Sequence, residues 1–295
     1  MLLKLGVILM ADCITGTCGC PAPMCPCSCT KTFGPQDLRR VWRVGTSADY
    51  PPFEDKDLND AIVGFDIDLI KVIAQKLRFV VDLHDMDFDS LLPALGVRYI
   101  DVVAAAISET SERREFAEFT NPYFSSPMVL LYREADDISD FEDLEGKIVA
   151  AQSGTIQEDL LWDIKEGNPP FDFLGPTDII IYTHTHLPTI VQKMSSSEIV
   201  EVRTSPTETV TGIIHATIMI DKGADSYVKS SHEPSHVRLQ RTEESFLFES
   251  IENCSFALPI GSSLVEIINN ILDELLVKGV IDQLIEKWFG APTIE

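Results

Sequence analysis

An arginine follows shortly after an apolar run in the segment SETSERREFAEFTNPYF, residues 108–124. The run ends in Ala-Ala-Ile before Ser108, and small side chains there let a ligand approach the backbone. Arg113, five residues further on, suits a carboxylate, because a guanidinium forms two parallel hydrogen bonds with that group. Ser108 adds a hydroxyl and an N–H from the same loop. We expect the neighbouring Arg114 to be solvated.

Two other segments carry groups that suit charged ligands. Ser153-Gly154-Thr155 precedes a predicted helix, and the free N–H groups of a first helical turn attract anions. Asp221 ends the apolar run HATIMID and suits an ammonium group. Groups for a carboxylate and for an ammonium together match an α-amino acid. The simpler alternatives are a surface arginine at position 113 and a helix-capping aspartate at position 221.

The apolar pattern predicts strands that alternate with helices from Trp42 onward. Strands are expected at 41–47, 79–86, 99–107, 127–134 and 215–221, and before the glycine turn at 153–155. Helices are expected at 64–77 with Asp66 as N-cap, at 88–95, after Thr155, and over 262–289 with a break at Gly279. Residues 164–211 are the least regular: 179–194 fits a strand and then a helix, and 195–210 has no clear period.

This alternation predicts an α/β fold with mostly parallel sheets. Two such cycles, joined by the extended segment 127–134, predict two lobes with a cleft between them. Ligands of open α/β sheets bind at the carboxyl ends of the strands. The cleft is therefore expected at the loops 47–53, 105–113 and 152–157 and at Asp221.

The composition indicates a globular and strongly acidic protein. The 295 residues include 23 Lys and Arg and 47 Asp and Glu, a formal net charge of -24. Two lobes are compatible with this length, since single cores stop growing near ~250–300 residues. Nucleic acid is not an expected partner, because binding phosphates requires basic patches. The acidity serves solubility or attracts a cationic solute. No uncharged apolar run reaches the ~18 residues of a membrane-spanning helix.

The first 35 residues differ from the rest. They begin like a secretory signal, with one early lysine and a short apolar run that Asp12 interrupts, and they hold six of the seven cysteines. We interpret residues 1–35 as an export signal or Cys-rich anchor segment, with Cys20 and Cys29 as candidate lipid-attachment sites. The alternatives are a low-complexity tail from a misplaced start codon, or a zinc knuckle, which tight spacing and the lack of a nearby histidine disfavour.

No metal and no cofactor are expected. His184 and His186 could point two imidazoles to one side of a strand, but a third ligand is not evident. The seventh cysteine, Cys254, is most simply a buried small residue.

Six motifs, in order, resemble the extracellular solute-binding proteins (family 3) of polar amino-acid ABC transporters. They are GTSADYPPFE, VGFDIDL, FDSLLPAL, the segment 108–124, SGTIQE and KGVIDQLIEKW. The resemblance covers residues 42–290 except 164–211, and the motifs are specific only together. It implies a two-lobe periplasmic-binding-protein-like fold (type II) with a ligand cleft between the lobes. The implied lobes are 41–128 with 255–290, and 129–254.

The resemblance also implies roles for single residues. Arg113 matches the arginine that clamps the ligand's α-carboxylate, with Ser108 and Thr155 as further donors to that group. Asp221 matches the acceptor for the α-ammonium. The other implied pocket residues are the aromatic pair that flanks the ligand side chain, Tyr50 and Phe88, and two first-lobe positions, Ser47 and Ala106.

Two departures affect the expected ligand. His215 stands where the family usually has an aspartate, and Ser47 stands where several binders of basic amino acids have an acid. Arginine is still the best candidate, because Tyr50 and Phe88 can form cation–π contacts. Four unassigned acids could receive a cationic ligand tail: Asp49, Glu54, Asp87 and Glu158.

The sequence thus predicts a periplasmic or cell-envelope protein, expected to be a monomer, that binds an amino acid and presents it to an ABC transporter permease. The function would be binding and not catalysis. One alternative is an enzyme on the same fold, similar to cyclohexadienyl dehydratase, which would require a general acid facing the leaving group. A second is an orphan amino-acid sensor or surface binder without a transporter; no receptor or murein-enzyme segment follows residue 290.

Overall fold

In a computed structural model of the chain, residues 40–138, 141–168, 177–230, 238–242 and 251–290 are described. By its internal contacts the chain divides into Met1–Arg40 and Val41–Glu295, and the fold below is that of the second unit. The predicted export segment, with Cys20 and Cys29, lies outside the described residues. No helix in these ranges is both long enough and apolar enough to cross a membrane.

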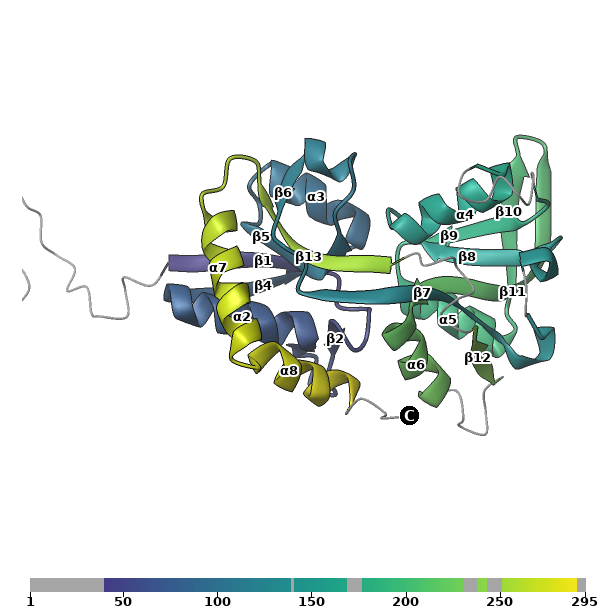
Figure 1. Cartoon of the computed structure of the whole chain (residues 1–295). Helices are drawn as coiled ribbons and strands as arrows, with labels where there is room; N and C mark the ends of the chain where they lie inside the picture. Colours follow the sequence, from purple (N-terminus) through teal and green to yellow (C-terminus); the bar gives the residue numbers. More distant parts are fainter. Residues whose placement is uncertain (1–39, 139–140, 169–176, 231–237, 243–250, 291–295) are drawn as a thin grey trace, which may run out of the picture. The chain divides into compact units, whose positions relative to one another are not determined.

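The first lobe is a parallel-stranded core covered by helices (Figure 1). Its elements are β1 (Arg40–Thr46), the hairpin β2 (Asp55–Lys56) and β3 (Ile62–Val63), α2 (Phe65–Leu77), β4 (Phe79–Asp85), α3 (Phe88–Gly96), β5 (Val102–Ser108), the 3-10 turn η1 (Arg113–Glu115), β6 (Ala117–Phe119) and the C-terminal helices α7 (Leu264–Val277) and α8 (Val280–Phe289). The strands lie in the order β4-β1-β5, and β1 is parallel to β5. The carboxyl ends of β1 and β5 therefore open at one edge, where the loops of the predicted site begin.

The second lobe repeats this α/β plan. It contains η2 (Glu134–Asp136), η3 (Phe141–Leu144), β8 (Ile148–Gln152), α4 (Ile156–Glu166), β9 (Ile180–His184), α5 (Leu187–Ser196), β10 (Ile199–Ser205), β11 (Glu208–Ile220), α6 (Asp221–Ser230) and β12 (Leu239–Arg241). Strand β8 is parallel to both β9 and β11. Strands β10 and β11 form an antiparallel hairpin.

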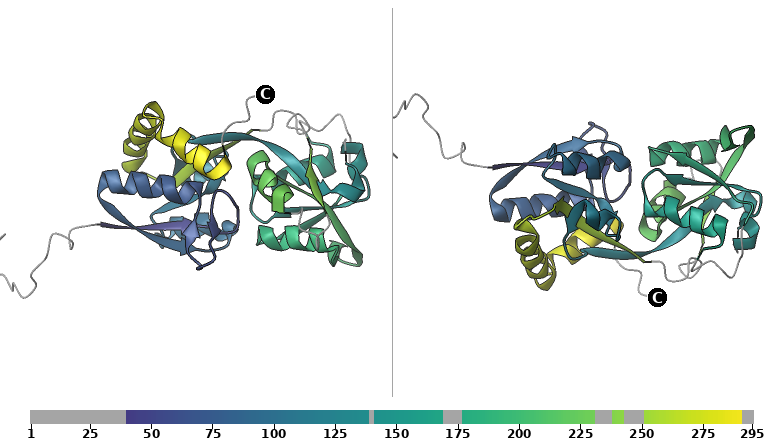
Figure 2. Two further views of the ribbon diagram at one scale, coloured as in Figure 1. Left: turned by 90° about the horizontal axis from the view of Figure 1, so that it is seen from below. Right: turned by 90° about the horizontal axis from the view of Figure 1, so that it is seen from above.

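Two long strands connect the lobes. Strands β7 (Phe124–Arg133) and β13 (Ile251–Pro259) lie side by side and antiparallel, as Figures 1 and 2 show. They join the two halves in one path, β4-β1-β5-β13-β7-β11-β8-β9. The two-lobe α/β fold agrees with the prediction. The pairing is more mixed than predicted, because both crossing strands and the β10–β11 hairpin are antiparallel.

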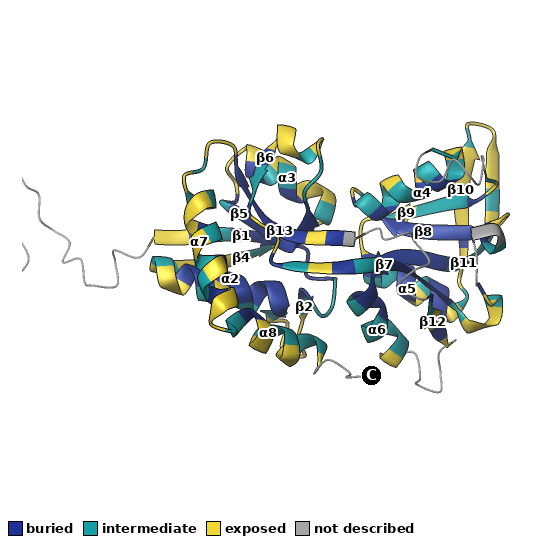
Figure 3. Cartoon of the chain, viewed as in Figure 1, coloured by how far each residue is buried: buried dark blue, intermediate teal, exposed yellow. Residues whose placement is uncertain are grey.

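Each lobe has its own apolar core, visible as the buried strands in Figure 3. In the first lobe Phe65, Ile70 and Phe256 belong to one cluster that packs under α2, α7 and α8. In the second lobe Leu161 and Ile218 belong to a separate cluster beneath α4. A second apolar cluster lies in each lobe, so packing within each lobe supports its side of the cleft.

Two local predictions need correction. The N-cap of α2 is Gly64, and Asp66 lies fully buried inside the first turn. The Asp66 carboxylate accepts hydrogen bonds from the Ala106 N–H (2.7 Å) and the Tyr123 hydroxyl instead of capping the helix. The segment 195–210, which has no clear period, ends α5 and forms β10 and the start of β11.

Gly64 provides a test of how the start of α2 is held. Its φ is +145°, and a Cβ there would lie 2.0 Å from the Phe53 carbonyl oxygen. Gly64→Ala should therefore lower the free energy of unfolding by roughly 2–4 kcal/mol in urea titrations. Gly96→Ala is the matched control, since a Cβ at Gly96 meets nothing within 4 Å and alanine is the better helix former. Equal effects of the two substitutions would contradict this account.

Candidate functional site

A cavity lies where the loops after β1, β5 and β8 meet. Its described lining residues include five of the predicted ones: Ser47, Tyr50, Phe88, Ala106 and Thr155. The cavity has a volume of about 20 Å³, room for about one water molecule. An amino acid could therefore enter only after the lining groups move apart.

Arg113 spans the two lobes beside this cavity. Its Nη1 donates to the Ser108 carbonyl (2.6 Å), and its Nη2 donates to the Gly154 carbonyl (3.0 Å). The guanidinium carbon lies 5.5 Å from the centroid of the Phe88 ring, a cation–π distance. Arg113 is half-buried, whereas Arg114 is exposed and pairs with Glu109. The two adjacent arginines thus have different surroundings, as the sequence predicts.

Ser108 points to a residue that the sequence analysis missed, Glu252 on the crossing strand β13. The Ser108 hydroxyl donates to Glu252 Oε1 (3.1 Å), and Gln157 Nε2 donates to Glu252 Oε2 (2.6 Å). Glu252 is 5% exposed and lines the cavity. Burial raises the pKa of Glu252 to about 7, against the opposing effect of the nearby Arg113 charge.

The Thr155 hydroxyl is engaged by its own helix. Thr155 is the N-cap of α4; its hydroxyl oxygen accepts from the Glu158 N–H (3.4 Å). The same hydroxyl donates to the Gln152 carbonyl (2.7 Å). A ligand carboxylate at this position would have to share or displace these bonds.

The structure does not bring Asp221 to the cavity wall. Asp221 is fully buried at the start of α6 and is not among the described lining residues. Its carboxylate forms ion pairs with Arg241 Nη1 (3.0 Å) and Lys222 Nζ (2.9 Å). The two cations already compensate the negative charge that was expected to receive an ammonium group.

Tyr50 and Ala106 are held by contacts from other elements. The Tyr50 hydroxyl accepts a hydrogen bond from the Ile220 N–H of the second lobe (2.8 Å). Ala106 has a φ of +44°, in the left-handed region that a residue with a Cβ rarely adopts. Its bond to the buried Asp66 holds that conformation. Burial raises the pKa of Asp66 to about 7, although both of its hydrogen bonds lower it.

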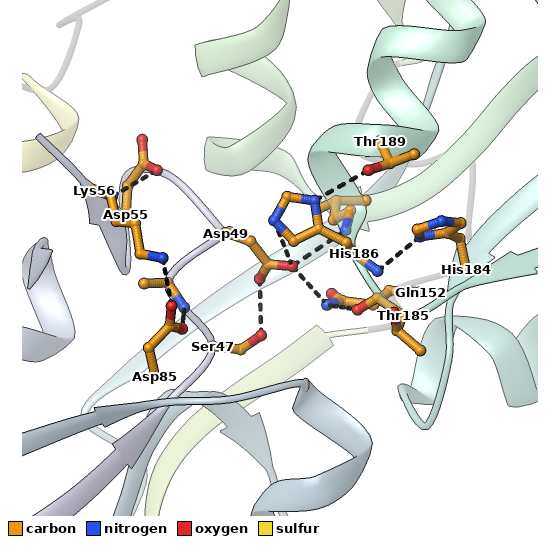
Figure 4. Close-up of polar contacts among 12 residues, drawn as sticks. Ser47, Asp49, Asp55, Lys56, Asp85, Gln152, His184, Thr185, His186 and Thr189 are labelled. Carbon is orange, nitrogen blue, oxygen red and sulfur yellow. Dashed lines mark hydrogen bonds and ion pairs between the residues drawn. The ribbon is translucent and has the colours of Figure 1, made fainter. Parts of the chain in front are cut away.

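Asp49 is a second buried acid on the cavity wall, and Figure 4 shows its contacts. Oδ1 accepts from the Ser47 hydroxyl (3.0 Å), and Oδ2 accepts from Gln152 Nε2 (3.0 Å) and the Leu187 N–H (3.2 Å). Leu187 is the first residue of α5, whose N-cap His186 makes no side-chain capping bond. Asp49 of the first lobe therefore caps a helix of the second. Burial raises its pKa to about 6, while the Ser47 bond and the His186 charge lower it.

Glu54 is the third acid on the wall. It is 1% exposed, and its Oε2 makes no hydrogen bond to any described residue. Burial raises the pKa of Glu54 well above its usual value, and the charges of Asp66 and Asp49 raise it further. None of the described lining residues is a lysine or an arginine. All three charged groups on the described wall are thus acids, set among neutral and apolar residues.

Other candidate residues have ordinary structural surroundings. His215 Nδ1 accepts a hydrogen bond from the Ile148 N–H (3.2 Å), so this ring joins β11 to β8. Cys254 is buried with a free thiol, as predicted. Among the described residues there is no group of three or more His, Cys, Asp and Glu side chains that could hold a metal ion.

Comparisons with known proteins point to one family. A family model described as bacterial extracellular solute-binding proteins, family 3, matches residues 42–291. The arginine-binding extracellular protein ArtP of Bacillus subtilis (strain 168) is 28% identical over 288 residues, 96% of each chain. The solved structure of an ancestral arginine-binding protein bound to arginine has a TM-score of 0.72 and 32% identity, covering 86% of this chain and 100% of that one. An ancestral amino-acid-binding protein, a precursor of cyclohexadienyl dehydratase, has a TM-score of 0.68 and 30% identity, covering 84% and 95%.

Asp49 predicts how stability depends on pH. Because its pKa is raised from 3.8 to about 6, the folded protein binds the Asp49 proton more tightly than the unfolded chain between those values. The stability that protonation of Asp49 adds to the folded state is fully present below pH 3.8 and is lost as the pH rises to about 6. Asp49→Asn should remove about 1–3 kcal/mol of pH dependence from the free energy of unfolding, measured in urea from pH 4 to 7.

The control for this experiment is Asp273→Asn, the same substitution at an exposed carboxylate on α7, remote from the cavity wall. A profile for the Asp49 variant that overlays the wild-type profile would contradict the assignment.

Proposed function

Since this chain belongs to the bacterial extracellular solute-binding proteins of family 3 and has their two-lobe, type II periplasmic-binding-protein fold, we propose that it binds a basic amino acid, with arginine as the best candidate. The proposed role is to deliver that amino acid to an ABC-type importer, without catalysis. One observation carries the choice of ligand: three buried carboxylates, of Asp49, Glu54 and Glu252, line one cavity.

An acidic wall favours a cationic ligand for a physical reason. Each of the three carboxyls has a raised pKa, which means that its ionised form is disfavoured by lost solvation. A ligand cation that replaces part of that solvation would stabilise the ionised forms. A neutral side chain would gain only hydrogen bonds from these groups, and an acidic one would be repelled by their ionised forms.

In the proposed complex the ligand's α-carboxylate lies near Arg113. The guanidinium of Arg113 would hold the α-carboxylate, and the hydroxyls of Ser108 and Thr155 would join it by turning from their present acceptors, Glu252 and the Gln152 carbonyl. Tyr50 and Phe88 would flank the ligand side chain. Ser47 and Ala106 would shape the first-lobe side of the pocket.

The cationic end of the ligand would lie between Asp49 and Glu54. Glu54 Oε2 makes no described hydrogen bond, so it has a free acceptor for a guanidinium N–H. The other two unassigned acids, Asp87 and Glu158, are not among the described residues of the cavity wall.

The proposal includes movement of the two lobes. The first lobe comprises residues 41–128 and 255–290, and the second comprises residues 129–254. Several described contacts already join groups from both sides, among them the bonds of Asp49 to Gln152 and of Arg113 to Gly154. Ligand binding would shift an equilibrium between open and closed forms by contacts that only the closed form makes. The closed form would then be recognised by the permease.

The names of the relatives support an amino-acid ligand. The Bacillus subtilis relative is named as an arginine-binding protein, and the ancestral structure holds arginine. We also propose export to the periplasm or cell envelope, with lipid attachment at Cys20 or Cys29, from the sequence of residues 1–35.

A dehydratase is the alternative that one observation favours. Glu252, with a pKa raised to about 7, has the protonation expected of a general acid at neutral pH. The substrates of such an enzyme, prephenate or arogenate, are anionic, and the acidic wall opposes their binding. Turnover of either compound, lost in Glu252→Gln, would favour the enzyme over the binding protein.

The proposed ligand is tested by a thermal-shift screen of the full chain against the twenty amino acids. Arginine should give the largest rise in melting temperature, lysine and histidine smaller rises, and aspartate and glutamate none. A ligand at a hundred times its Kd adds about 2.7 kcal/mol of stability. Absence of a shift with every amino acid would refute the proposed function.

The two adjacent arginines allow a matched test of the carboxylate clamp. Arg113→Gln should weaken arginine binding by a factor of about 30 or more in calorimetry, because it removes a charged partner from a desolvated site. Arg114→Gln removes the same charge from the exposed neighbour and should change affinity less than about threefold. Similar losses in the two variants would show that Arg113 has no specific role.

A further inference from the structure

We propose that Glu252, and not Asp221, accepts the α-ammonium group of the ligand. This inference rests on the proposed amino-acid binding and names the residue that completes that site. Neither the sequence motifs nor the position of Asp221 at a strand end indicated it.

The chemistry of an α-amino acid limits where the acceptor can be. The carboxylate and the ammonium are attached to one carbon, so their protein partners must be neighbours. Glu252 meets this condition, because its Oε1 lies 3.1 Å from the Ser108 hydroxyl. The carbonyl of the same Ser108 accepts from Arg113 at 2.6 Å. Ser108 of β5 therefore contacts both the proposed carboxylate clamp, Arg113, and the proposed ammonium acceptor, Glu252.

Asp221 does not meet the condition in this structure. Both of its oxygens face cations of the second lobe, Arg241 at 3.0 Å and Lys222 at 2.9 Å. An ammonium group would have to approach a carboxylate already flanked by two positive charges. It would also have to reach a residue that is not on the described cavity wall.

The Glu252 side chain also connects the two lobes. It lies on the crossing strand β13, where it pairs with Ser126 of the other crossing strand, β7, and Cys254 two residues on pairs with Ser108 of β5. Its Oε2 accepts at 2.6 Å from Gln157, a residue in the first turn of α4 in the second lobe. The carboxylate therefore contacts groups of both lobes. An ammonium bound there would be held by a group that the second lobe orients.

Burial gives the interaction its expected strength. Glu252 is 5% exposed, and its two described hydrogen bonds come from a neutral hydroxyl and a neutral amide. A charged hydrogen-bond donor in a desolvated site interacts more strongly than these neutral groups. The raised pKa of Glu252 agrees with a carboxylate whose charge is incompletely compensated.

The test compares two ligands that differ only in the ammonium group: L-arginine and 5-guanidinopentanoate, which is arginine without its α-amino group. Calorimetry is carried out with the full chain and with Glu252→Gln. Wild type should bind arginine about 10- to 100-fold more tightly than the desamino compound. In Glu252→Gln this preference should fall to within about threefold, because arginine loses affinity and the desamino compound does not.

Asp221→Asn is measured in the same way, because Asp221 is the alternative ammonium acceptor. If Glu252 is the acceptor, this variant keeps the wild-type preference for arginine over the desamino compound. The inference is overturned if the preference persists in Glu252→Gln, if that variant binds arginine more tightly, or if Asp221→Asn removes the preference instead. The two ligands can be compared on the wild-type protein even if a variant fails to fold. Equal wild-type affinities for arginine and the desamino compound also overturn the inference. Binding of neither ligand by wild type would instead refute arginine as the ligand in the proposed function.

Discussion

Burial of negative charge is the constraint on which the site depends. Asp49, Glu54 and Glu252 are each at most 5% exposed on the wall of one cavity, and burial raises the pKa of each. Buried charges persist in proteins only where hydrogen bonds or opposite charges compensate them. Neutral hydroxyl and amide donors compensate Asp49 and Glu252 in part, whereas Glu54 Oε2 accepts no hydrogen bond from a described residue. A cationic ligand would supply what is missing, so the same groups that lower stability would favour binding.

The scaffold places these acids by long-range pairing. Strand β13 returns from the second lobe and pairs with β5, which brings Glu252 beside Ser108. The loop after β1 carries Asp49 to the start of α5 in the other lobe. Inside the first lobe, the buried Asp66 holds Ala106 in its left-handed conformation on the cavity wall. Stability and function thus depend on the same few carboxylates.

The sequence predicted the architecture better than the site. Alternating apolar segments and small residues at strand ends were sufficient for the two-lobe fold and for the loops around the cavity. The β10 strand was missed although IVEVRTS alternates buried and exposed residues, because the stretch is short and polar. Asp66 has the sequence context of an N-cap, and only the packed structure shows its bonds to Ala106 and Tyr123. The position of Glu252 and the ion pair of Asp221 with Arg241 depend on strand pairing between distant segments, which leaves no local signal.

The most direct test of the central claim is a crystal structure of the full chain with L-arginine. The account predicts the α-carboxylate on Arg113 and Ser108, the α-ammonium on Glu252, and the guanidinium between Asp49 and Glu54. Arginine bound outside this cavity, or bound with its guanidinium on Glu252 and its α-carbon at Asp49, would contradict it.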